Sequence, residues 1–192
     1  SLVDGEATAL IRALEAAHDL ASPIVKAFGG EHVDPVEKLN RARHTLEGVV
    51  PRAQELGIRI VVETHDGFAR GEELARLLEP FDSTVGALWD IQNSVVAGES
   101  TLETEAAIGT RIVHAHVKDA TCHDVWKPCE LGEGELPLVD FVAALRRSGF
   151  AGFLSFDHEK HWHPELADPQ DSLPRAAALL RALIDAPDAV VA

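Results

Sequence analysis

The feature that most constrains this chain is its alternation of short apolar runs with longer amphipathic stretches. Runs of five to seven residues, rich in β-branched side chains, cover residues 23–28, 58–63, 85–91, 112–117 and 152–156. Helical periodicity covers residues 5–20, 35–56, 71–78, 101–108, 138–147 and 173–184. Strands that alternate with helices are the pattern of βα units around a parallel sheet. The sequence therefore predicts an α/β protein.

The number of predicted strands is small for a closed barrel. A (β/α) barrel of the TIM type has eight strands and about 250 residues, whereas this chain has 192 residues and five strand candidates. We expect one domain over residues 1–192, an incomplete parallel barrel whose five βα units correspond to strands 4 to 8. Residues 121–136 are polar and without periodicity, so we expect an extended loop over the catalytic face.

The composition and charge of the chain indicate which binding partners and which cellular location to expect. Asp and Glu number 32 against 17 Lys and Arg, a formal charge of −15, which argues against nucleic acid because phosphate binding needs clustered basic side chains. No apolar run approaches the roughly 20 residues that span a bilayer, and no secretory signal pattern opens the chain. Cys122 and Cys129 are expected to be free thiols. We therefore expect a cytoplasmic protein without a membrane partner.

Acidic or imidazole side chains fall at the ends of four successive predicted strands. They are Glu63, Asp90, His116 and Asp157, and a barrel brings the carboxyl ends of its strands to one face. Three carboxylates and one imidazole suit one divalent metal ion, Mn²⁺, Mg²⁺, Co²⁺ or Zn²⁺. A single carboxylate at a strand end is more often a solvated side chain, and a single strand histidine is more often part of the core. The same position at four successive strand ends makes that alternative weaker. His114 shares a strand face with His116; we favour His116 because it is nearer the strand end.

Several segments together resemble the sugar phosphate isomerase/epimerase family, the xylose isomerase-like TIM barrels. The resemblance is carried by KAFGG at 26–30, VVETH at 61–65, LWD at 88–90, HAHVKD at 114–119, LGEGELP at 131–137 and GFLSFDHEKHWHPEL at 152–166. It implies that Glu63, Asp90, His116 and Asp157 bind one metal and that Glu63 and Asp157 are the catalytic bases. The implied reaction passes through a metal-stabilised enediolate of a small ketose, polyol or keto-acid.

The sequence departs from the family pattern at two positions. Asp157 stands where the family has Glu, so its carboxylate reaches about one methylene less, and a misplacement of about 1 Å can cost on the order of 100-fold in rate. Glu159 has the same strand parity and could substitute. Asn93 stands where many relatives carry a substrate-binding His. The expected substrate-binding residues are His65, Asn93, Lys118 and Glu159.

These observations predict a divalent-metal-dependent sugar (phosphate) isomerase or epimerase with a small carbohydrate substrate. Two alternatives stay open: an inosose-type dehydratase using the same enediolate chemistry, and a catalytically idle barrel fragment serving as a binding or oligomerisation module. Lys118 also has a bland interpretation, in which it pairs with Asp119 to hold the loop. Because five strands leave two sheet edges unpaired, we expect a homo-oligomer.

Overall fold

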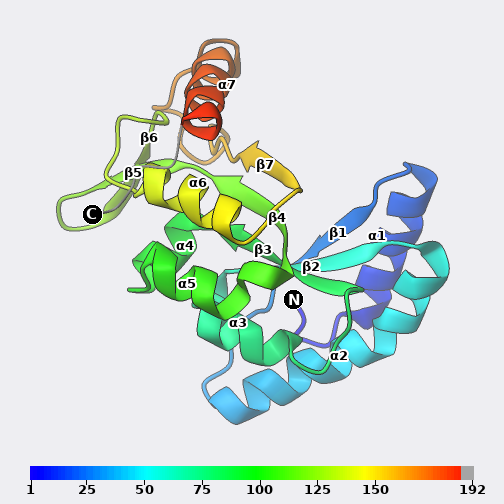
Figure 1. The fold of residues 1–192 in the computed structure, drawn as a ribbon. Coiled ribbons are helices and arrows are strands. Elements are labelled where there is room, and N and C mark those ends of the chain that lie inside the picture. The colour runs from blue at the N-terminus through cyan, green and yellow to red at the C-terminus, as the bar shows by residue number, and fades with distance from the viewer. Residues whose placement is uncertain (187–192) are drawn as a thin grey trace.

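The computed structural model describes residues 1–186, which contain one five-stranded sheet and one two-stranded sheet. The large sheet has the order β1-β2-β3-β4-β7, and every neighbouring pair is parallel (Figure 1). Its strands are β1 (Ile24–Ala27), β2 (Arg59–Glu63), β3 (Val85–Asp90), β4 (Ile112–Val117) and β7 (Phe153–Phe156). The sheet is half of a (β/α) barrel, which confirms the predicted fold class.

Seven α-helices accompany these strands in residues 1–186. They are α1 (Ala7–Asp19), α2 (Pro35–Leu56), α3 (Gly71–Leu78), α4 (Ile91–Val96), α5 (Thr101–Ile108), α6 (Leu138–Arg147) and α7 (Pro169–Asp185), with short 3-10 turns η1 (Asp66–Phe68) and η2 (Gly109–Arg111). Helices α2, α3, α5 and α6 follow one another along one face of the sheet (Figure 1). Within the described residues, none of these helices combines the length and apolarity required to cross a bilayer.

The boundaries of the longer helices follow from local sequence. Asp34 caps α2 by accepting hydrogen bonds from two backbone N–H groups of its first turn, and Pro35 occupies the first helical position. The same helix ends at Gly57, which takes a left-handed conformation with φ of 67°. Ser100 and Glu103 form a reciprocal capping box at the start of α5. These signals explain why the predicted bounds of α2 and α5 agree with the structure.

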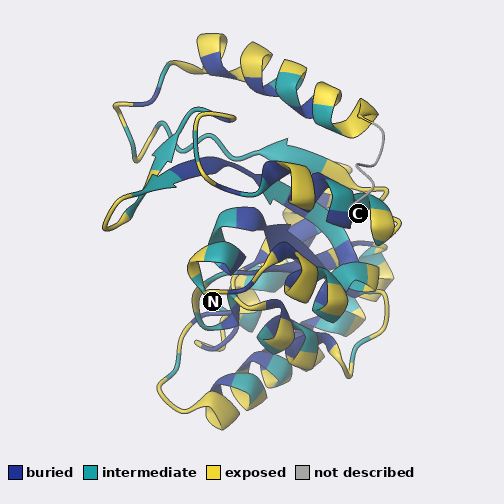
Figure 2. Cartoon of the chain, turned by 60° about the vertical axis from the view of Figure 1, so that its left-hand side comes forward, coloured by how far each residue is buried: buried dark blue, intermediate teal, exposed yellow. Residues whose placement is uncertain are grey.

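Alternation along the strands divides the sheet into two chemically different faces. Ile60, Val62, Ala87 and Trp89 are fully buried and belong to the core between sheet and helices. Trp89 meets Phe141 of α6 edge to face, with ring centroids 4.6 Å apart. Figure 2 shows the matching pattern on the helices, buried on one side and exposed on the other. The side chains that alternate with these core residues lie on the opposite face of the sheet. They include the polar residues at the strand ends, Glu63, Asp90 and His116.

Part of the predicted loop over residues 121–136 is structured, so that prediction is wrong there. β5 (Asp119–Cys122) and β6 (Trp126–Cys129) form an antiparallel hairpin. Its base is held by Asp119, whose carboxylate accepts hydrogen bonds from the backbone N–H groups of Ala120, Gly132, Gly134 and Leu136. A Cβ at Gly134 would lie 2.1 Å from Asp119 Oδ1. The glycines of this segment therefore serve to wrap the chain around one buried carboxylate.

Two further elements differ from the prediction. Helix α4 was not expected, because it is only six residues long and begins directly after the strand end at Asp90. Helix α7 begins at Pro169, four residues before the predicted start; Asp168 and Pro169 repeat the Asp-Pro sequence at the start of α2, but the Asp168 side chain makes no capping hydrogen bond.

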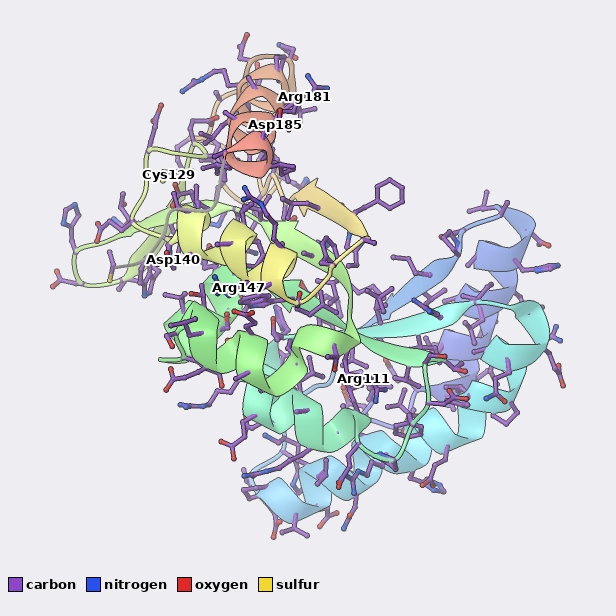
Figure 3. The ribbon with its side chains drawn as sticks, in the orientation of Figure 1. Arg111, Cys129, Asp140, Arg147, Arg181 and Asp185 are labelled. Atoms are coloured by element: carbon purple, nitrogen blue, oxygen red, sulfur yellow. The ribbon has the colours of Figure 1, made fainter. Side chains whose placement is uncertain are left out.

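Two arginines tie neighbouring βα units together. Arg111 donates hydrogen bonds to the carbonyl oxygens of Asp82 and Val85, at 3.1 and 2.6 Å, and so joins the amino-terminal ends of β3 and β4 (Figure 3). Arg147 donates through Nε to Glu105, at 3.1 Å, and so joins α6 to α5. These contacts lie away from the carboxyl ends of the strands and contribute to the scaffold.

Candidate metal centre

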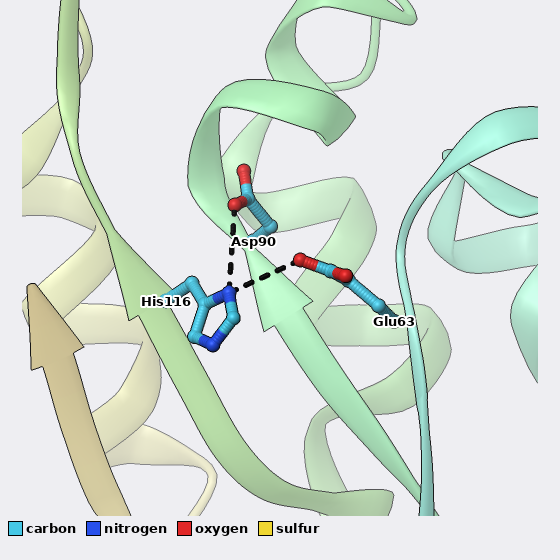
Figure 4. Close-up of side chains that lie close together, drawn as sticks. All are labelled: Glu63, Asp90 and His116. Carbon is cyan, nitrogen blue, oxygen red and sulfur yellow. Dashed lines mark hydrogen bonds and ion pairs between the residues drawn. The ribbon is translucent and has the colours of Figure 1, made fainter. Parts of the chain in front are cut away.

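Three of the predicted ligands converge at the carboxyl ends of β2, β3 and β4. One ligand atom from each of Glu63, Asp90 and His116 lies within 4.8 Å of the others. His116 Nδ1 is 3.1 Å from Glu63 Oε1 and 3.9 Å from Asp90 Oδ2 (Figure 4). The arrangement follows from the parallel register, which places Asp90 opposite His116 on the adjacent strand.

Glu63 is buried, and its carboxylate contacts the side chains of Lys26 and His116. Its side chain is 3% exposed, with His116 on Oε1 and Lys26 Nζ 2.9 Å from Oε2. Burial raises the pKa of Glu63, but hydrogen bonds from His116 and Lys26 outweigh burial and lower that pKa to about 2. Glu63 is therefore ionised throughout the physiological range, as a metal ligand must be.

Asp90 is the deepest carboxylate of the cluster. Its side chain is fully buried, and Oδ1 accepts the backbone N–H of Asn93 at 3.0 Å, which caps α4. Oδ2 accepts no hydrogen bond of good geometry, although Lys118 Nζ lies 3.1 Å away. Burial raises the pKa of Asp90, and the charge of Lys118 only partly opposes this. A buried carboxylate oxygen without a hydrogen-bonding partner, facing a carboxylate and an imidazole, fits a divalent cation.

Asp157, the fourth predicted ligand, lies at the margin of the cluster. Its backbone N–H continues the β7 pairing by donating to the carbonyl of Val117, and its Oδ2 is 3.8 Å from His116 Nδ1. The side chain is 36% exposed and pairs with Lys118 at 3.2 Å. Asp157 is outside the group of ligand atoms that lie within 4.8 Å of one another. Its role as ligand and base stays a prediction.

An open cavity of about 300 Å³ lies beside the cluster. Its walls include Glu63 and Asp157 together with three of the four predicted substrate-binding residues, His65, Lys118 and Glu159. Asn93 is set apart from these walls on α4, where its Nδ2 is buried without a hydrogen-bond partner. The structure thus brings the proposed bases and most of the proposed substrate contacts to one opening.

Two aromatic rings also border the cavity. Phe28 packs edge to face against the His65 ring, with centroids 4.9 Å apart, and Trp162 packs in the same way against His161 at 4.5 Å. Both aromatic side chains are exposed, Phe28 by 40% and Trp162 by 76%. Apolar faces beside hydroxyl-binding groups are suited to the mixed surface of a carbohydrate.

Lys26 is a site residue that the sequence did not predict: it contacts both Glu63 and the Phe28 ring, 4.2 Å from the ring centroid. A lysine inside the apolar run of β1 was the available signal. His114, which competed with His116 in the sequence, lies deeper, 2.9 Å from Ser155 Oγ. Burial, and then the neighbouring His116, lower the pKa of His114. The geometry therefore supports the choice of His116 as the imidazole of the cluster.

The chain belongs to the xylose isomerase-like TIM barrel family. The model of that family matches residues 4–183, nearly the whole chain. This confirms the resemblance carried by the segments at the strand ends. No curated protein sequence matches the chain.

Solved structures of similar fold include sugar epimerases. A D-tagatose 3-epimerase-like protein is 22% identical with a TM-score of 0.75, over 93% of this chain and 68% of its own. The IolI protein, solved with a zinc atom, is 16% identical with a TM-score of 0.77, over 92% and 68%. D-allulose 3-epimerase from Methylomonas sp. is 17% identical with a TM-score of 0.75, over 92% and 68%. At these identities the likeness establishes the fold.

Proposed function

We propose that the protein is a divalent-metal-dependent isomerase or epimerase of a small carbohydrate. The observation that carries the proposal is the cluster of Glu63, Asp90 and His116 at the ends of three adjacent parallel strands, with their ligand atoms within 4.8 Å of one another. We include Asp157 as the fourth ligand because its Oδ2 lies 3.8 Å from His116 Nδ1. Family membership and the fold shared with sugar epimerases support the assignment.

In this proposal the chain's own residues divide the work of proton transfer. A bound divalent cation would polarise the substrate carbonyl and stabilise the charge of an enediolate. Glu63, ionised and fixed by His116 and Lys26, takes the proton next to that carbonyl. Asp157, which follows β7, the strand across β3 and β4 from β2, enters the step protonated and gives its proton to the opposite face of the planar carbon; Glu63 then passes the proton it took to solvent, and Asp157 takes one from solvent. His65, Asn93, Lys118 and Glu159 are the proposed contacts for substrate hydroxyl groups.

A solvent-exchange experiment tests this function. Incubation with Mn²⁺ and D-tagatose or D-allulose in D₂O should introduce deuterium next to the carbonyl, observed by proton NMR. Glu63→Gln keeps the shape of the side chain but removes the base, so exchange should fall at least about 100-fold. Lys38→Gln, which changes a buried lysine that pairs with Glu73 and is not among the residues lining the cavity, is the matched control. Exchange that is undiminished in Glu63→Gln contradicts the proposed base.

Two alternatives predict different results in the same experiment. An inosose-type dehydratase would lose water, and its unsaturated product would be visible in the same spectra. An idle fragment that serves as a binding or oligomerisation module would bind the ketose without exchange. The second alternative is favoured by the exposure of Asp157, 36%, and by the two outer strands β1 and β7, which pair with no further strand in residues 1–186. The cytoplasmic location stays a prediction.

A further inference from the structure

Lys118 occupies an unusual position beside the metal centre. Its side chain is only 9% exposed, and its ammonium group lies 3.1 Å from Asp90 Oδ2, 3.2 Å from Asp157 Oδ2 and 2.8 Å from Glu159 Oε1. Burial lowers the pKa of Lys118, but the surrounding carboxylates outweigh it and raise that pKa above its ordinary value. The ammonium thus donates hydrogen bonds to Asp157 and Glu159 and forms an ion pair with Asp90, so three carboxylates share its single positive charge.

Two of those three oxygens are the ones that a cation needs. Asp90 Oδ1 already accepts the backbone N–H of Asn93, so Oδ2 is the oxygen available as a ligand. Asp157 Oδ2 is likewise the oxygen that faces His116 Nδ1, at 3.8 Å. The Lys118 ammonium and a divalent cation would therefore compete for the same two atoms, Asp90 Oδ2 and Asp157 Oδ2.

It is electrostatically unfavourable for the ammonium and a divalent cation to contact these two oxygens at the same time. A divalent cation approaches carboxylate oxygens to about 2.0–2.2 Å, which would place it within a few ångströms of a charged ammonium that contacts the same oxygens. Like charges at such distances repel strongly where water is excluded. One of the two must withdraw, and the lysine side chain is the flexible partner.

Glu159 provides the place to which Lys118 can withdraw. It makes the shortest of the three contacts and lies beyond the end of β7, two residues past Asp157. Its side chain is 26% exposed, more open than Asp90. Rotation of the lysine toward Glu159 keeps one charge pair while freeing both ligand oxygens.

We propose that Lys118 is a built-in competitor for the cation: the ammonium neutralises Asp90 and Asp157, and metal binding requires it to give up both oxygens and stay on Glu159. This assignment rests on the proposed metal centre and gives Lys118 a function in controlling metal affinity, beyond its proposed contact with substrate. It makes a directional claim, because an ordinary supporting residue would strengthen metal binding, whereas a competitor weakens it.

Titration with Mn²⁺, followed by the electron paramagnetic resonance signal of the free ion, tests the direction. Lys118→Gln should bind Mn²⁺ at least about tenfold more tightly than the wild type. Lys38→Gln, which also removes a buried lysine paired with a carboxylate, should leave Mn²⁺ affinity unchanged. Loss of affinity in Lys118→Gln, of the roughly 10–100-fold size typical of supporting residues, overturns the proposal.

Glu159→Gln supplies a second test, and its single variant does not depend on the folding of Lys118→Gln. Without Glu159 the ammonium is held on the ligand oxygens, so Mn²⁺ affinity should fall several-fold. In the double variant with Lys118→Gln that loss should disappear, because no ammonium remains to be relocated. A loss of equal size with and without Lys118 overturns the proposal. A wild-type chain that binds no Mn²⁺, by contrast, refutes the metal centre itself and with it the proposed function.

Thermal unfolding gives a readout that is independent of the affinity fit. Lys118→Gln leaves the buried Asp90 carboxylate without its counter-charge, so its melting temperature should lie below that of the wild type when metal is removed with a chelator. Saturating Mn²⁺ should raise the melting temperature of Lys118→Gln by more than it raises that of the wild type. An equal or smaller rise contradicts the competition.

Discussion

The middle of the sheet and its β7 edge hold their carboxylates in different ways. Glu63 and Asp90 end strands with a neighbour on each side, and their side chains are 3% and 0% exposed. Asp157 follows β7, which pairs only with β4 in the described residues, and is 36% exposed. A lysine pairs with each of the three, Lys26 with Glu63 and Lys118 with both Asp90 and Asp157, so burial is what distinguishes the first two from the third. We therefore expect metal affinity to depend mainly on the middle of the sheet, and the return of the proton to depend on the edge.

The largest expected effect is on metal affinity at the middle. Asp90→Asn keeps the cap on α4, because the amide oxygen can still accept the Asn93 N–H, but removes the charge from the buried ligand. We expect Mn²⁺ affinity to fall about 100-fold or more, against about tenfold for Asp157→Asn at the edge. Titration of free Mn²⁺ measures both. Equal losses would show that the two regions contribute alike and would remove the distinction.

The next largest effect concerns stability in acid. The pKa of Glu63 lies at about 2 in the folded chain, below its ordinary value of 4.5. The stabilisation is therefore complete above about pH 4.5 and is lost as the pH falls toward 2, and it corresponds to roughly 3 kcal/mol. Glu63→Gln should lose less unfolding free energy than the wild type across this window.

Urea unfolding at several pH values, with a chelator present, measures this difference. Glu72→Gln, which changes an exposed carboxylate on α3, is the control. Its unfolding free energy should depend on pH in the same way as that of the wild type. An acid-induced loss in Glu63→Gln that matches the wild type would contradict the proposed role of Lys26 and His116 in holding the middle of the site.

A smaller effect is expected from lengthening the carboxylate at the edge. Asp157→Glu adds the methylene that the family resemblance implies, and we expect ketose deuterium exchange to rise about tenfold while Mn²⁺ affinity changes little. The measurement is proton NMR in D₂O, scored against Asp157→Asn. A rise in metal affinity without a rise in exchange would assign Asp157 to metal binding alone. No change in either would favour Glu159 as the acting carboxylate of the edge.

The sequence predicted what depends on local periodicity. Glu63, Asp90 and His116 could be placed together because each closes an apolar run, and parallel strands bring their carboxyl ends to one side. Strand parity also puts His114, His116 and Lys118 on one face. That parity was the available signal that Lys118 faces the cluster, while Asp119 turns away to the backbone of residues 132–136.

What could not be predicted depends on contacts distant in sequence. The hairpin of β5 and β6 has a proline at residue 128 and no apolar alternation, and it is organised by hydrogen bonds from residues 13 to 17 positions beyond Asp119. The pairing of Lys26 with Glu63 spans 37 residues. Such contacts have no local pattern, because they are set by the register of β1 on β2 and by the path of the chain around Asp119.

The smallest expected effect is a factor of two in mass, and it tests the β7 edge as an interface. We expect the chain of 192 residues to form a homo-oligomer, most simply a two-fold dimer, because β7 leaves backbone groups unpaired within the described residues and presents Phe153 with 78% exposure. A charge on an edge strand opposes pairing with another chain, so Phe153→Lys should shift the dimer toward the monomer. Val139→Lys, an exposed apolar position on α6, is the matched control and should leave the mass unchanged. Light scattering at micromolar concentration measures the mass of both variants. A wild-type chain that is monomeric at that concentration would show that this edge does not recruit a partner. Dissociation by both variants would place the interface elsewhere.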